Sequence, residues 1–190
     1  MTADINLKFP QTGRFIDETG AVVNLVENGS LKTQTKNETA IFEGKAFDFS
    51  AYGTIANGQS LTLIGAVDGN KVIFNGMTLD FSSGGVLLEF IESPTISNQG
   101  TLQSTHKKNR SLNTSGTLLV YSGATVTGGT VIFVDKKPLV TGVGQRVSAS
   151  NSGIENGWVL NKYTNYAIRL TNQSGASVDF TGTFGWVEEI

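Results

Sequence analysis

The stretch YAIRLTNQSGASVDFTGTFGW, residues 166–186, carries the pattern that decides the fold. Apolar and polar side chains alternate on both sides of a small polar loop, as in β-strands that bury one face. The first run places Tyr166, Ile168 and Leu170 on a single face. The second run places four large apolar side chains on one face: Val178, Phe180, Phe184 and Trp186. We therefore expect two strands here, each with one buried face.

These two strands allow two arrangements. If they pair as a hairpin, their apolar faces match only in registers such as Leu170 opposite Phe180, because a one-residue slip would put Leu170 opposite Asp179. If they lie in opposite sheets of a sandwich, both apolar faces still point at a shared core. In either case Phe180, Phe184 and Trp186 are expected in the core rather than on a platform that stacks sugars or bases.

Turn signals divide the rest of the chain into short segments. Asn-Gly pairs at residues 28–29, 57–58, 75–76 and 156–157 accept the positive φ angles of tight hairpin turns. Between such turns, β-branched and aromatic runs predict strands. The predicted strands span residues 14–17, 21–26, 46–52, 59–67, 71–74, 77–81, 86–92, 117–121, 131–135, 158–160, 164–171 and 178–187. No window shows the 3.6-residue apolar repeat of an amphipathic helix, so we expect little helix.

A polar segment, GSLKTQTKNET at residues 29–39, separates two regions of different character. Before it lies a small predicted hairpin, and an isolated two-stranded hairpin is only marginally stable in water. We expect this hairpin to pack on its own domain, on a sister subunit or on another protein. The many short strands after the linker are typical of a β-sandwich. The expected chain is all-β: an N-terminal arm of residues 1–39 precedes a jelly-roll-like β-sandwich of residues 40–190.

The composition argues against several classes of function. The chain has no cysteine, which excludes disulfides and Cys–zinc sites, and its net charge of −2 argues against nucleic acid as the main partner. No run approaches the about 20 apolar residues that span a membrane, so we expect no membrane partner. The N-terminus lacks the basic head and apolar run of a signal peptide, so we expect no secretion.

Few residues suggest chemistry. The sequence has no nucleophile elbow, phosphate loop or zinc-protease motif, and we expect no enzyme, no cofactor and no bound metal. Three carboxylate pairs could in principle serve a glycosidase: Asp17/Glu18, Glu89/Glu92 and Glu188/Glu189. The pairs at 17–18 and 188–189 are expected to be solvated, at a turn and at the end of the chain. The single histidine, His106, lies in the segment HKKNR, which is either a solvated loop or a contact with an acidic neighbour.

Three motifs resemble a family of small tailed-bacteriophage virion proteins, the head decoration, cement or stabilisation proteins. They are the loop with Asn109-Arg110, the run TLLVYSGATVTGGT at residues 117–130, and the closing segment at residues 166–188. The resemblance covers residues 85–190 well and extends more loosely back to about residue 40. It implies a jelly-roll-like sandwich that sits on the outside of a capsid and clamps neighbouring major capsid subunits.

The resemblance also implies a setting and a set of contacts. Such proteins are made in the host cytoplasm and bind a repeating lattice multivalently, so we expect a homo-oligomer, a trimer at three-fold or a dimer at two-fold positions. The major capsid protein is the expected partner. The expected contact residues lie in the arm and in the basic segment: Phe9, Phe15, Ile16, Val22, Lys107, Lys108 and Arg110.

Two other functions stay open on the sequence alone. A receptor- or carbohydrate-binding module of a tail or fibre would need exposed aromatics on one face or in a groove. The candidates are Tyr52, Tyr121, Trp158 and Tyr163. An enzyme such as a glycan depolymerase would need a cleft with converging carboxylates.

Overall fold

The computed structural model describes residues 15–16, 22–23, 26–27, 30–31, 36–112, 116–138, 147–150 and 157–189. The chain divides into two compact units, Met1–Glu38 and Thr39–Ile190. Among its described residues, the first unit contains two antiparallel pairs of short strands: β1 (Phe15–Ile16) with β2 (Val22–Val23), and β3 (Val26–Glu27) with β4 (Ser30–Leu31). The β1–β2 pair is the hairpin that the sequence predicted.

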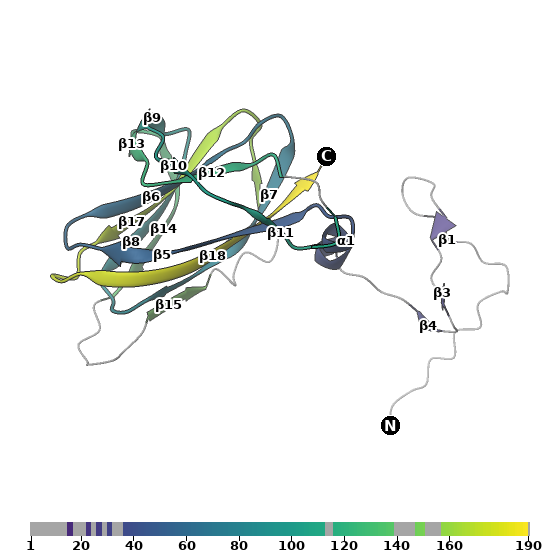
Figure 1. Cartoon of the computed structure of the whole chain (residues 1–190), viewed down its shortest axis with the longest axis horizontal. Helices are drawn as coiled ribbons and strands as arrows, with labels where there is room; N and C mark the ends of the chain where they lie inside the picture. The colour runs from purple at the N-terminus through teal and green to yellow at the C-terminus, as the bar shows by residue number, and fades with distance from the viewer. Residues whose placement is uncertain are drawn as a thin grey trace, which may run out of the picture. The chain divides into compact units, whose positions relative to one another are not determined.

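The second unit is a sandwich of two antiparallel sheets (Figure 1). One sheet has the order β10-β12-β6-β17-β8-β14, formed by Thr101–Leu102, Leu119–Ser122, Ser60–Ala66, Asn165–Asn172, Val86–Glu92 and Thr130–Lys137. The other has the order β11-β5-β18-β7-β15, formed by His106–Lys107, Ala46–Ile55, Val178–Glu189, Lys71–Phe81 and Val147–Ser150. A further strand, β16 (Trp158–Leu160), also pairs with β7.

The order of the strands is that of a jelly roll. Four neighbouring strands of one sheet, β6-β17-β8-β14, interleave along the chain with β5-β18-β7-β15 of the other, so that β5, β6, β7 and β8 alternate between the sheets. This confirms the predicted fold class. It also decides between the two arrangements of residues 166–186, because β17 and β18 lie in opposite sheets.

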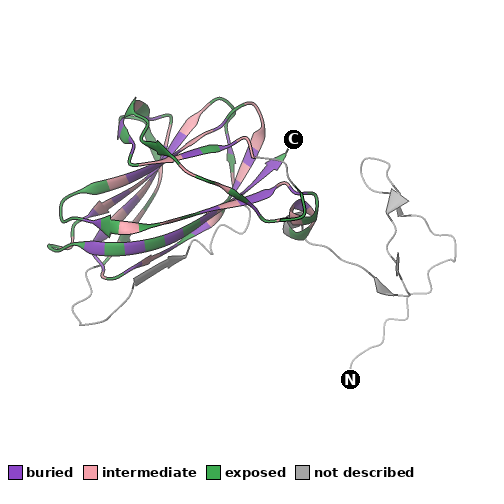
Figure 2. Cartoon of the chain, in the orientation of Figure 1, coloured by how far each residue is buried: buried purple, intermediate pink, exposed green. Residues whose placement is uncertain are grey.

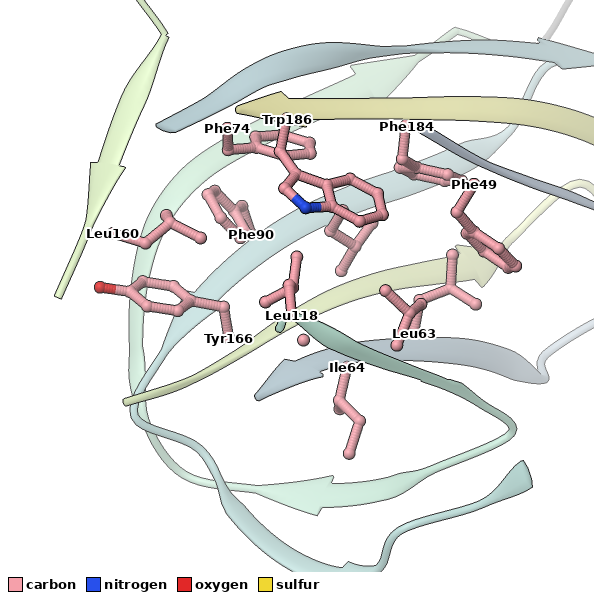
Figure 3. Close-up of a pocket in the computed structure, with 13 residues that line it drawn as sticks. Phe49, Leu63, Ile64, Phe74, Phe90, Leu118, Leu160, Tyr166, Phe184 and Trp186 are labelled. Carbon is pink, nitrogen blue, oxygen red and sulfur yellow. The ribbon is translucent and has the colours of Figure 1, made fainter. Parts of the chain in front are cut away.

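The core lies between the sheets and is built by strict alternation. Along β18 buried and exposed residues alternate from Val178 to Phe184 (Figure 2). Phe184 stacks on Phe49 with ring centroids 5.9 Å apart, and Trp186 stacks on Phe47 at 6.0 Å. Phe180, Phe184 and Trp186 are each at most 4% exposed, which confirms them as core residues. A cavity of about 50 Å³ remains among the aromatic and aliphatic side chains (Figure 3).

The long strand β7 differs from the prediction, which placed two strands at 71–74 and 77–81 around an Asn-Gly turn. Gly76 pairs with Gly185 and Phe74 pairs with Trp186, so Asn75 is an extra residue on β7. Gly76 has φ 129°. A β-bulge absorbs the Asn-Gly pair without reversing the chain, so the prediction of a turn here was wrong.

The helix α1 (Lys36–Phe42) occupies part of the segment predicted to be a polar linker. Ala40 packs with Ala46 and Val187 on the outer face of the second sheet, which explains why Val187 is buried although it points away from the main core. Gly44 adopts φ 71°, and its N–H donates to the carbonyl of Ile41 at 3.0 Å, which ends the helix. Tertiary packing therefore stabilises a helix that has no long apolar stripe.

The connection between β8 and β14, residues 93–129, is an elaborate insertion. Its strand β9 (Thr95–Asn98) pairs with β13 (Thr125–Thr127), and Val126 and Ala124 pack with Ile64 and Ile91 in a second apolar cluster. β10 and β12 extend the first sheet beyond β6, and β11 extends the second sheet beyond β5 (Figure 1). The insertion thus contacts both sheets along the β5–β6 side of the sandwich. The sequence predicted only the strand at 117–121 within it.

Candidate functional site

The basic segment, residues 106–110, begins in strand β11 of the insertion. β11 pairs with the start of β5, with His106 opposite Asp48 and Lys107 opposite Phe47. The pleat of the strand sends successive side chains to opposite faces, so His106 and Lys108 are exposed and Lys107 is 9% exposed. His106 is exposed as predicted. The expectation of a wholly solvated segment is wrong for Lys107, because pairing with β5 turns its side chain toward the sandwich.

The two exposed cations of this segment, Lys108 and Arg110, sit on an ordered loop. Between them, Asn109 donates from Nδ2 to the carbonyl of Phe42 at 2.9 Å, at the end of α1. Its Oδ1 accepts hydrogen bonds from the N–H of Ser111 at 3.1 Å and from its hydroxyl at 2.6 Å. The backbone N–H of Lys108 donates to the carbonyl of Ala46 at 2.9 Å. The loop is therefore fixed against the helix through which the chain enters the sandwich.

Glu188 fixes the insertion at a second place, Thr117 and Leu118. Expected to be solvated, it is 0% exposed. Its Oε2 accepts the N–H and the hydroxyl of Thr117 at 2.7 and 2.8 Å. Its Oε1 accepts the N–H of Leu118 and the indole N–H of Trp186, both at 3.0 Å. Four donors replace the water that a carboxylate would otherwise bind, so the buried group is fully satisfied.

The alternation that the sequence showed also explains why Glu188 points inward. Phe184, Trp186 and Glu188 follow one another at two-residue spacing, so all three project from the same face of β18. Gly116 supplies the space: a Cβ there would lie 3.0 Å from Oε1 of Glu188 and 3.1 Å from the ring of Phe47. The two-residue alternation of β18 continues from Trp186 to Glu188. This alternation was the signal in the sequence that could have identified Glu188 as an inward-pointing residue.

The other predicted carboxylates serve as cross-strand links. Glu89 accepts from Nε of Arg169 at 2.8 Å between β8 and β17. Glu92 accepts from the hydroxyl of Tyr166 at 2.6 Å and from Nδ2 of Asn161 at 2.9 Å. Burial and the hydrogen bond to Glu92 raise the pKa of Tyr166 to about 12. Asp17 and Glu18 lie outside the described residues.

The four aromatic candidates for glycan binding lie in different surroundings. Trp158 packs edge-on against Phe90 with ring centroids 5.9 Å apart, and Tyr121 packs against the second apolar cluster. Tyr52 on β5 is 86% exposed, and Tyr163, in the turn before β17, is 79% exposed with φ 57°. Two of the four are therefore structural, and two are available at the surface.

The predicted contact residues of the arm lie outside what the structure describes at the level of side chains. Phe15 and Ile16 form β1, and Val22 begins β2, with Ile16 opposite Val22 in the register. Phe9 lies in a range that is not described. The described side chains of the predicted contact surface are thus those of the basic segment.

Within the ranges described, no group of three or more His, Asp or Glu side chains is arranged to hold a metal ion. The helix in that part of the chain is too short and too polar to cross a membrane. Comparisons with models of protein families, with curated proteins and with solved structures gave no significant match.

Proposed function

We propose that this chain is a structural virion protein of a tailed bacteriophage, which binds the outside of the assembled capsid and stabilises contacts between major capsid subunits. The jelly-roll sandwich is the fold that the resemblance of residues 85–190 implies. A protein of this kind works by adhesion, and adhesion needs a rigid body with a fixed contact surface. The basic segment supplies such a surface.

The observation that carries the proposal is the position of Lys108 and Arg110. Both are exposed, and the Asn109 side chain ties their loop to the end of α1. The basic segment and the helix that follows the N-terminal arm therefore meet at one place on the sandwich. A partner that binds there can contact the loop and the end of α1 together.

The insertion that carries this loop is held firmly. β11 pairs with β5 on one side, and Glu188 accepts hydrogen bonds from Thr117 and Leu118 on the other. A fixed loop loses little conformational entropy when a partner binds, so weak electrostatic contacts keep more of their energy. On a capsid, the many copies of a repeating site add such contacts together, and a trimer or dimer of this chain adds them further.

Co-sedimentation with phage heads tests the proposal. Purified protein is mixed with undecorated heads, and bound copies per head are measured as the protein concentration rises. We expect saturation at a fixed stoichiometry. The double variant Lys108→Glu/Arg110→Glu should weaken binding at least about tenfold at low salt, and less at high salt, because exposed charges are screened.

The matched control is Lys136→Glu/Lys162→Glu, which reverses two exposed charges outside the basic segment. It should bind heads like the unmodified protein. No co-sedimentation of the unmodified protein would refute the capsid role. Equal weakening by the two double variants would refute the role of the basic segment.

One observation favours the alternative of a carbohydrate-binding module on a tail or fibre. Tyr52 is 86% exposed on β5, and its cross-strand neighbour on β18 is Thr181, also exposed. An exposed ring beside a hydroxyl is a surface on which a sugar can stack. A glycan array read with the unmodified protein and with Tyr52→Ala tests this function, and an array without hits contradicts it.

A further inference from the structure

A second feature of the basic segment is independent of the capsid role. The side chain of Lys107 lines a cavity of about 360 Å³ between the insertion and the start of β5. Its other walls include Phe47, Gln103, Thr105, Leu102 and Leu118. This volume falls within the roughly 300–1,000 Å³ of small-molecule sites. The wall combines one cation, a few polar groups and several aliphatic side chains.

The charge of Lys107 is only partly compensated by the protein. Its Nζ lies 5.7 Å from the centroid of the Phe47 ring, a cation–π contact. Gly44 lies close beside it, because a Cβ on Gly44 would be 3.0 Å from Nζ. Among the side chains described, no carboxylate lies within ion-pairing distance of Lys107. The Lys107 residue is 9% exposed, so the protein covers most of its side chain, and its ammonium group has no carboxylate partner among the described side chains.

An anion that enters the cavity can pair with the Lys107 ammonium group beside a largely apolar wall, where a charge-assisted hydrogen bond is stronger than a neutral one. The aliphatic part of the wall selects among anions. Inorganic phosphate would leave the leucines facing a strongly hydrated ion. A carboxylate on a short alkyl chain places its charge at Lys107 and its chain against Leu102 and Leu118.

We propose that this cavity binds a carboxylate carried on a short aliphatic chain, with Lys107 as the cationic anchor and Phe47 as the floor beneath it. The carboxylate belongs either to a small free acid or to a glutamate side chain of a protein. Both sources present the same chemistry to the cavity. They differ in whether a peptide backbone accompanies the group.

The test is a titration of the full chain, followed by the NMR resonances of the lysine Cε–Hε groups. The Lys107 resonance is assigned by its absence in Lys107→Met, which keeps the length of the side chain and removes the charge. Sodium butyrate is the probe, and butyramide is its neutral counterpart. A glutamate blocked at both its amino and carboxyl ends forms the second arm. Sodium chloride keeps the ionic strength constant.

We expect butyrate to shift the Lys107 resonance saturably, with a dissociation constant of about 1–10 mM, and to leave Lys108 unshifted. Butyramide should bind at least about tenfold more weakly. Tighter binding of the blocked glutamate than of butyrate would assign the site to a protein side chain, and the reverse order would assign it to a free acid. Thr105→Phe, which narrows the cavity and keeps the charge, should abolish the saturable shift.

Three outcomes would overturn the proposal. They are a linear shift without saturation, equal binding of butyrate and butyramide, and equal shifts of Lys107 and Lys108. The first two outcomes can be read on the unmodified chain from any lysine resonance that shifts, so they do not depend on the folding of Lys107→Met. The capsid experiment uses Lys108 and Arg110 instead, so failure of either proposal leaves the other unaffected.

Discussion

The substitution Glu188→Gln tests the most unusual group in the core. The buried carboxylate accepts four hydrogen bonds, from Thr117 N–H and Oγ, Leu118 N–H and Trp186 Nε1. A glutamine has almost the same shape but carries one oxygen and one NH2 group. Whichever position the NH2 group takes, it faces a backbone N–H that loses its acceptor. The hydrogen bonds that remain are weaker, because the amide oxygen of glutamine carries no negative charge.

The magnitude follows from these contacts. A hydrogen bond to a charged group contributes roughly 1.5–3 kcal/mol, and a buried donor without an acceptor costs roughly 1–3 kcal/mol. The hydroxyl of Thr117 can rotate and accept from the amide, which recovers part of the loss. We therefore expect Glu188→Gln to lower the free energy of unfolding by roughly 2–4 kcal/mol.

Urea denaturation measures this change, and Glu189→Gln is the matched control. Glu189 is the next residue along β18, its side chain is 50% exposed, and its partner is Lys71 at 2.7 Å. An exposed ion pair of this kind contributes less than about 1 kcal/mol. Hydrogen exchange gives a second readout, because the amides of Thr117 and Leu118 should lose protection in Glu188→Gln. A change below about 1 kcal/mol with both amides still protected would refute the assigned role.

Three further predictions concern single features. Gly128 and Gly129 have φ 62° and 84°, but only at Gly129 would a Cβ approach the carbonyl oxygen of Glu92, to 2.8 Å. Gly128→Ala should cost about 1 kcal/mol and Gly129→Ala at least about 2 kcal/mol by urea denaturation, and equal costs would contradict the crowding. Because the pKa of Tyr166 is raised to about 12, its contribution to stability is complete below pH 10 and is lost as the pH rises through 12. The free energy of unfolding should therefore fall by roughly 2–3 kcal/mol more between those values than in Tyr166→Phe, and parallel pH curves would contradict this. A chain that begins at Lys36 keeps α1 and should unfold cooperatively within about 1 kcal/mol of the full chain, since Thr39–Ile190 forms a compact unit of its own; loss of cooperative unfolding would show otherwise.

The fold could be predicted from the sequence where strands are long. In residues 166–186 the two-residue period is sustained for long enough to fix which side chains point inward, and the core residues followed from it. The choice between a hairpin and opposite sheets could not be made. That choice depends on β6 and β8, which flank β17 on both sides and leave no edge for β18.

Apart from the strand predicted at 117–121, the insertion could not be predicted, because its strands are too short to show a two-residue period. β10 and β11 contain two residues each, and they exist because β12 and β5 offer free edges to pair with. α1 was missed for a related reason, since its apolar side chain Ala40 packs on the outer face of the second sheet, where it meets Val187 of β18. The Asn75-Gly76 pair was misread because the same dipeptide suits a tight turn and a bulge, and only the register with β18 distinguishes them.

The candidate site shows the same division. Glu188 continues the alternation of Phe184 and Trp186, so its burial could have been predicted from the sequence. The expectation that charges near the end of the chain are solvated led to the opposite prediction. The burial of Lys107 could not have been predicted, because it depends on the register in which β11 pairs with β5. Side chains placed by a strand's own period are predictable, and those placed by a partner strand distant in sequence are not.

The position of β18 has a consequence for biosynthesis. β5 pairs with residues 178–187 along its whole length, and β7 pairs with β18 from the other side. On the ribosome, every other strand of that sheet is made before β18, so β5 and β7 each keep one edge unpaired until β18 has emerged. The sheet is therefore completed only by the last of its strands, and the unpaired edges of β5 and β7 are where we expect chaperones to bind the nascent chain.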